Sequence, residues 1–73
     1  DKGDVDKQMR AADAEVVAGA PEKAFDRLIE TMKTTAGDEK SRVRERLLEL
    51  FGLFEGNDPR VLEARTKLAS ALY

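Results

Sequence analysis

The basic stretch Lys40-Ser41-Arg42-Val43-Arg44-Glu45-Arg46 could bind an anion such as a phosphate. Residues two apart on a helix point about 200° apart, so Arg42 and Arg46 flank one side of an apolar stripe while Arg44 flanks the other. Long side chains in flanking positions usually lay their methylenes along the core edge and keep their charge in water. We therefore interpret the stretch as a solvated helix flank, with a phosphate or nucleic-acid site as the alternative.

Arg65 has an unusual position, because helical spacing places it between Val61, Leu68 and Leu72 on the apolar face of the last helical segment. A guanidinium in such a place needs a partner, and we expect a carboxylate or the helix-end carbonyls of a neighbouring helix. The alternative is that Arg65 is an exposed clamp for a carboxylate of a binding partner.

Residue types suited to catalysis or metal binding are scarce. The sequence has no Cys and no His, so it lacks the ligands of a structural zinc site and the imidazole of a nucleophile pair. Asp1, Asp4 and Asp6 lie close together but lack the Gly and the terminal Glu of a calcium loop, which favours a frayed acidic end. Ser41 and Ser70 have no base or nucleophile-elbow context. We expect no enzymatic activity and no cofactor.

Charge is nearly balanced, with 13 Lys and Arg residues against 15 Asp and Glu residues and a formal net charge of −2. A nucleic-acid binder normally carries a basic patch, since neutralisation of phosphates dominates its affinity. We expect no nucleic-acid partner, and a small helical nucleic-acid binder is a remote alternative. The sequence has no run of 18 apolar residues and no signal-peptide pattern, so we expect no membrane partner and a cytoplasmic location.

Glycines and prolines divide the chain into four segments of helical composition. The first runs from about Asp4 to Ala18; the second starts at Pro21 and is closed by Gly37; the third follows Asp38 as its N-cap; the fourth runs from Asp58-Pro59 to the C-terminus. Because the connections are short, consecutive helices should pack as antiparallel neighbours. The sequence thus predicts one all-α domain over residues 1–73, with four helices arranged as two antiparallel helical hairpins.

Each segment carries apolar residues at helical spacing, which predicts its core-facing stripe. The four stripes are Val5, Met9, Ala12 and Val16; Phe25, Leu28, Ile29 and Met32; Val43, Leu47, Leu50, Phe51 and Phe54; and Val61, Leu68 and Leu72. Other apolar residues fall off these stripes, namely Val17, Leu48, Leu53 and the terminal Tyr73. They either cover the sides of the helix contacts or form an interface with a further helix, domain or client.

The first hairpin, with Gly19-Ala20-Pro21-Glu22-Lys23-Ala24-Phe25 at its turn, resembles a tetratricopeptide repeat. In such a repeat a Gly ends the first helix, and a small residue near the start of the second helix lets the two approach closely. The fold class predicted above is therefore tetratricopeptide-like.

A wider resemblance covers about Met9 to Tyr73. Residues 14–29, then Gly37-Asp38-Glu39, residues 46–51, and the closing segment over residues 58–73 are similar to the C-terminal part of bacterial YbbN/CnoX-type thioredoxin-like proteins, actinobacterial members most of all. The resemblance implies an upstream thioredoxin fold in a longer protein, with any redox chemistry there. It also implies a co-chaperone that passes clients to the chaperonin and Hsp70 systems, and it supplies no catalytic residue for this region.

These observations predict a protein-interaction module that binds chaperones or unfolded clients. We expect a curved face formed mainly by the first and third helices, a second docking surface at the end of the last helix, and contributions from the following residues: Arg10, Arg44, Leu48, Leu53, Arg65, Leu72 and Tyr73. The alternative is a structural or self-association domain that braces its parent protein.

Overall fold

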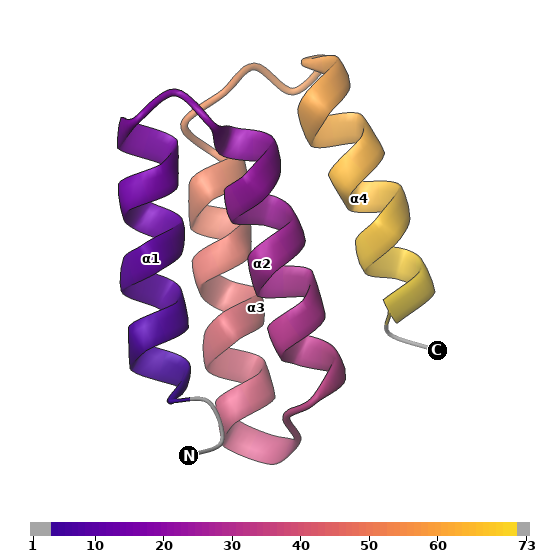
Figure 1. Cartoon of the computed structure of the whole chain (residues 1–73). Coiled ribbons are helices and arrows are strands. Elements are labelled where there is room, and N and C mark those ends of the chain that lie inside the picture. The colour runs from indigo at the N-terminus through magenta and orange to yellow at the C-terminus, as the bar shows by residue number, and fades with distance from the viewer. Residues whose placement is uncertain (1–3, 72–73) are drawn as a thin grey trace.

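The computed structural model describes residues 4–71, which form four α-helices joined by short connections (Figure 1). The helices are α1 (Val5–Val17), α2 (Pro21–Lys33), α3 (Gly37–Phe51) and α4 (Pro59–Ala71). The prediction of an all-α fold with four helices is therefore confirmed. No helix among these described residues is long and apolar enough to cross a membrane.

The turn between α1 and α2 has the conformation that its sequence predicts. Gly19 adopts a φ of 87°, a left-handed backbone conformation that glycine adopts without a steric penalty. The Gly19 N–H donates to the Val16 carbonyl at 3.1 Å, and the Ala20 N–H donates to the Glu15 carbonyl at 2.8 Å. These two bonds close the C-terminus of α1, and Pro21 then begins α2 at the position where its missing N–H costs nothing.

The boundary between α2 and α3 differs from the prediction. Helix α2 ends at Lys33, well before Gly37, because the hydroxyls of Thr34 and Thr35 both donate to the Thr31 carbonyl at 3.0 Å and satisfy the end of the helix. Gly37, with a φ of 62°, is the first residue of α3. The prediction of Asp38 as the N-cap was wrong, since Asp38 lies inside the first turn of α3.

The start of α4 is where the Asp58-Pro59 pair predicts it. The Asp58 Oδ1 atom accepts a hydrogen bond from the Arg60 backbone N–H at 2.9 Å, which caps the first turn. Phe54 was predicted to extend the stripe of the third helix, but it lies beyond the end of α3 in the connection to α4. Its ring still packs on the core, with its centroid 5.9 Å from that of Phe25.

Helix α2 is the central element of the packing, because it contacts each of the other three helices. Helix α4 lies along α2 on the side away from α1 and has few contacts with α3, as Figure 1 shows. The predicted stripe residues within 4–71 are buried, except Val16 and Phe54, which are half-buried; Ala24 and Ala64 are buried as well. Because α4 packs mainly on α2, the flank of α3 that points towards α4 is only partly covered.

Candidate protein-interaction surface

The face shared by α1 and α3 is covered by paired charges. Arg42 forms an ion pair with Asp6 across the two helices, and Arg46 lies 3.8 Å from Asp13 and 3.5 Å from Glu49. A shallow cleft of about 190 Å³ lies over this face, with Arg42 and Arg46 in its wall. Exposed ion pairs such as these contribute little to stability, so their main effect here is to neutralise the face.

The predicted contact residues on the first and third helices do not share this face. Arg10 is exposed on α1 one turn after Asp6, beside the paired charges. Arg42 and Arg46 point towards α1, and residues two positions away on a helix point roughly 200° from them. Arg44 and Leu48 therefore lie on the opposite flank of α3 from Arg42 and Arg46, and a curved binding face with contacts from Arg10, Arg44, Leu48 and Leu53 stays a prediction.

Arg65 belongs to this other flank, where it meets α3. Its guanidinium carbon lies 5.3 Å from the centroid of the Phe51 ring, which is a cation–π distance. Arg65 is exposed, and within residues 4–71 it makes no ion pair with a carboxylate. In the described part of the chain, the face of an aromatic ring lies against the guanidinium in place of the expected carboxylate or helix-end carbonyls.

We define the α3–α4 face as Arg44, Leu48 and Phe51 of α3 together with Leu62 and Arg65 of α4. The α3 residues are four and then three positions apart, and the two α4 residues are three positions apart. Residues at these spacings lie on one side of a helix. The contact between Arg65 and Phe51 joins the two sides. Leu48 remains 39% exposed and Leu62 49% exposed. This face brings uncovered apolar side chains next to two cations.

Leu62 was not identified by the sequence reasoning. It directly follows Val61, which is buried, and the signal that could have found it is the same one that found Leu48: an apolar residue off the core stripe of its helix. Leu53, in the turn after α3, is 66% exposed, and Val17, at the end of α1, is exposed as well. Leu72 and Tyr73 lie outside the described residues.

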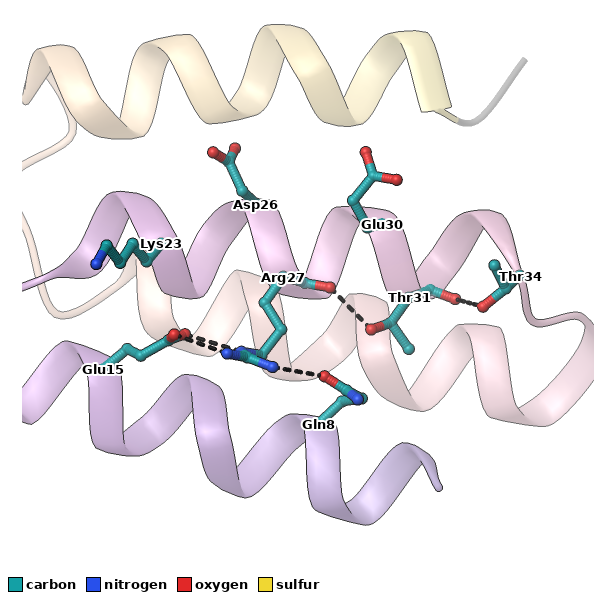
Figure 2. A pocket seen from close by; sticks show the side chains of 8 residues that line it. All are labelled: Gln8, Glu15, Lys23, Asp26, Arg27, Glu30, Thr31 and Thr34. Atoms are coloured by element: carbon teal, nitrogen blue, oxygen red, sulfur yellow. Dashed lines mark hydrogen bonds and ion pairs between the residues drawn. The ribbon is translucent and has the colours of Figure 1, made fainter. Parts of the chain in front are cut away.

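The sequence reasoning also missed a partly buried polar network between α1 and α2. Arg27 of α2 donates from Nε and Nη2 to the two carboxylate oxygens of Glu15 at 3.0 and 2.9 Å, and from Nη1 to the Gln8 side chain at 2.9 Å (Figure 2). The bonds between Arg27 and Glu15 lower the pKa of Glu15, against the opposing effect of burial, and raise the pKa of Arg27. Each of the three guanidinium nitrogens of Arg27 donates one hydrogen bond to α1, so Arg27 braces α1 on α2.

Figure 2 also shows what surrounds this brace. An open groove of about 590 Å³ runs past it, and Asp26 and Glu30 point from α2 towards α4, away from Arg27. Asp26 is engaged as well, because Lys67 of α4 donates to it at 3.1 Å, a bond that raises the pKa of Lys67. The polar groups here hold helices together, and we assign no ligand to the groove.

The acidic residues of the N-terminal segment have structural partners. Asp4 caps α1 by accepting from the Lys7 N–H at 3.4 Å, and Asp6 pairs with Arg42. Asp1 lies outside the described residues. Within residues 4–71 there is no group of three acidic side chains that could hold a metal ion.

Comparison with known proteins gives the family. A family model described as a tetratricopeptide repeat matches residues 1–73. This chain belongs to the tetratricopeptide-repeat family. Domains of this family are typically non-catalytic and bind other proteins, so protein partners are expected generally for this tetratricopeptide domain.

The relatives come from mycobacteria. The uncharacterized protein Rv1324 of Mycobacterium tuberculosis and the uncharacterized protein Mb1359 of Mycobacterium bovis are each 47% identical to this chain over 70 residues. The match covers 96% of this chain and 23% of each relative, so the chain spans about a quarter of their length. No solved structure matches the chain.

Proposed function

We propose that this tetratricopeptide domain is the protein-docking module of a thioredoxin-like co-chaperone, which binds a chaperone of the Hsp70 or chaperonin systems or an unfolded client. The family membership supports the general role of binding proteins. The resemblance to YbbN/CnoX-type proteins, carried by residues 14–29, 46–51 and 58–73, supports the co-chaperone setting. In this proposal any redox chemistry belongs to another part of the whole protein.

The observation that carries the proposal is the exposure of Leu48 and Leu62 on the α3–α4 face. Leu48 lies one turn before the buried Phe51 on α3, and Leu62 lies one turn before Arg65 on α4, whose guanidinium lies over the Phe51 ring. Apolar surface gathered at one place on a small domain marks an interaction site more often than scattered apolar residues do. Removing it from water releases about 25 cal/mol per Å² of apolar area, which supplies a driving force for docking.

Self-association through the same leucines is the second candidate, and the charges of the face argue against it. Two copies that met through this face would bring Arg44 and Arg65 of one copy close to the same cations of the other. Like charges placed across an interface disfavour the complex. A different protein, free to present acidic groups, is the better occupant.

The test of the proposal uses purified Hsp70, purified chaperonin and a chemically unfolded client protein, each offered to the 73-residue chain on a biosensor surface. We expect at least one of the three to bind, and Leu48→Glu to weaken that binding severalfold. Val17→Glu is the matched control, because it makes the same apolar-to-acidic change at an exposed residue on α1. Circular dichroism confirms that each variant is folded.

Absence of binding to all three proteins would refute the co-chaperone setting. Equal losses from Leu48→Glu and Val17→Glu would instead refute the α3–α4 face as the docking site. Sedimentation equilibrium of the chain alone decides the second candidate: a tight dimer that Leu48→Glu dissociates would favour the structural role.

A further inference from the structure

The charged residues of the α3–α4 face all have the same sign. Arg44 and Arg65 belong to the face, and neither makes an ion pair within residues 4–71. Lys40 lies one turn before Arg44 on the same side of α3. The whole chain has a formal net charge of −2, so this cationic face reverses the overall sign of the molecule.

The acidic residues in the bodies of the same two helices face elsewhere. Glu45 and Glu49 of α3 line the cleft on the α1 side, together with Arg42 and Arg46. Glu63 of α4 lines the small pocket between α2 and α4. The cations of the α3–α4 face are therefore left without acidic neighbours from either helix body, unlike the paired cations that face α1.

The arrangement of apolar and charged residues indicates the shape of an occupant. Leu48 is on α3 and Leu62 is on α4, two helices that run in opposite directions (Figure 1) and share few contacts. The contact between Phe51 and Arg65 joins these two helices. An amphipathic helix offers a continuous apolar stripe with charged residues along both of its edges. Such a helix could cover both leucines while its edge residues reach Arg44 on α3 and Arg65 on α4.

We propose that the α3–α4 face docks an acidic amphipathic helix of a partner protein, whose Asp or Glu side chains pair with Arg44 and Arg65 while its apolar stripe covers Leu48 and Leu62. This inference rests on the proposed protein-docking function and adds the chemical class of the docked segment. The cations select the partner by charge complementarity, and the leucines supply the apolar area that holds it.

The experiment uses two synthetic helical peptides that have the same apolar stripe and differ in their edge residues, which are Glu in one and Lys in the other. Each peptide carries a fluorophore and is titrated with the 73-residue chain while fluorescence anisotropy is measured. We expect the Glu peptide to bind at least about tenfold more tightly than the Lys peptide, because one meets opposite charges and the other like charges. Raising the salt concentration should narrow this difference.

Two variants and one matched control locate the site. Arg44→Glu combined with Arg65→Gln should remove most of the preference for the Glu peptide, because the first change reverses one positive charge and the second removes the other. Lys7→Glu reverses an exposed cation on α1 and should leave the preference unchanged. Leu48→Ser should weaken both peptides, and circular dichroism verifies that the variants are folded.

The outcomes separate this inference from the proposed function. Equal affinity for the two peptides would overturn the inference. So would a loss of the preference for the Glu peptide in Lys7→Glu as large as the loss in the variant with Arg44→Glu and Arg65→Gln. If Hsp70, chaperonin or client binds the chain but neither peptide does, the inference fails and the co-chaperone function stands. If the Glu peptide binds at Arg44 and Arg65 while none of those proteins binds, the inference stands and the co-chaperone function fails.

Discussion

Replacement of Phe51 tests the centre of the packing. Its side chain is 3% exposed, its ring centroid lies 4.9 Å from that of Phe25 at an interplanar angle of 75°, and the guanidinium of Arg65 lies over its ring. Truncation of a buried Phe to Ala costs about 3–5 kcal/mol, from lost apolar burial and the cavity left behind. A domain of this length has a free energy of unfolding of roughly 4–11 kcal/mol, at about 0.05–0.15 kcal/mol per residue. Phe51→Ala should therefore remove a large part of the stability.

Urea unfolding followed by circular dichroism measures this loss, with Leu53→Ala as the control. Leu53 is 66% exposed, so its truncation should change the free energy of unfolding by less than about 0.5 kcal/mol. An unchanged urea midpoint for Phe51→Ala would refute the placement of Phe51 in the core.

The contact between Arg65 and Phe51 can be isolated by a double-mutant cycle, in which Arg65→Gln is made in both the wild type and Phe51→Leu. We expect a coupling free energy of about 0.5–1 kcal/mol. A coupling of zero would mean that the cation–π contact does not stabilise the fold.

Three further predictions concern the turns and ion pairs. Gly19→Ala should lower the free energy of unfolding by roughly 1–2 kcal/mol, because a residue with a Cβ is strained at a positive φ even where no neighbouring atom approaches the Cβ. An unaltered melting temperature would contradict the left-handed conformation of residue 19. The hydrogen bond from Arg60 lowers the pKa of Asp58 in the folded protein. The Asp58 carboxylate therefore stabilises the fold at pH values above about 4, its pKa in the unfolded chain, and this stabilisation is lost as the pH falls through the lower pKa of the folded state. Asp58→Asn should consequently reduce the acid-induced loss of stability, and identical pH profiles for variant and wild type would disprove the cap. Arg27→Ala should cost about 1 kcal/mol or less in urea unfolding, since the brace to Glu15 is partly exposed; a loss of several kcal/mol would show that the brace is essential to the fold.

The sequence predicted the elements whose signals are local. Gly19 followed by Pro21 specifies both the end of α1 and the start of α2, since each residue acts through its own backbone geometry. Asp58 before Pro59 does the same for α4. The apolar spacing in α3 identified Phe51 as a core residue for an equally local reason, because one face of a helix follows directly from its periodicity.

Features that depend on competing local bonds or on tertiary packing were not predicted. Gly37 predicted a later end for α2 than the structure shows, because the hydroxyls of Thr34 and Thr35 bond to the Thr31 carbonyl at the end of the helix. The spacing of these threonines does not indicate which carbonyl they bond. The partner of Arg65 depends on how α4 lies against α3, and a single helical wheel contains no information about a neighbouring helix. Helical spacing did predict that Arg44 lies on the other side of α3 from Arg42 and Arg46, but it could not show which of the two sides faces α1.

The central claim is that this tetratricopeptide domain docks another protein through its α3–α4 face. Its most direct test is the amide NMR spectrum of the isotope-labelled chain, recorded during titration with Hsp70, chaperonin or unfolded client. We predict that signals of Arg44, Leu48, Leu62 and Arg65 shift or broaden first, and that Leu48→Glu abolishes the effect. Changes centred instead on the α1–α3 face around Arg10, or a spectrum that no added protein alters, would contradict the claim.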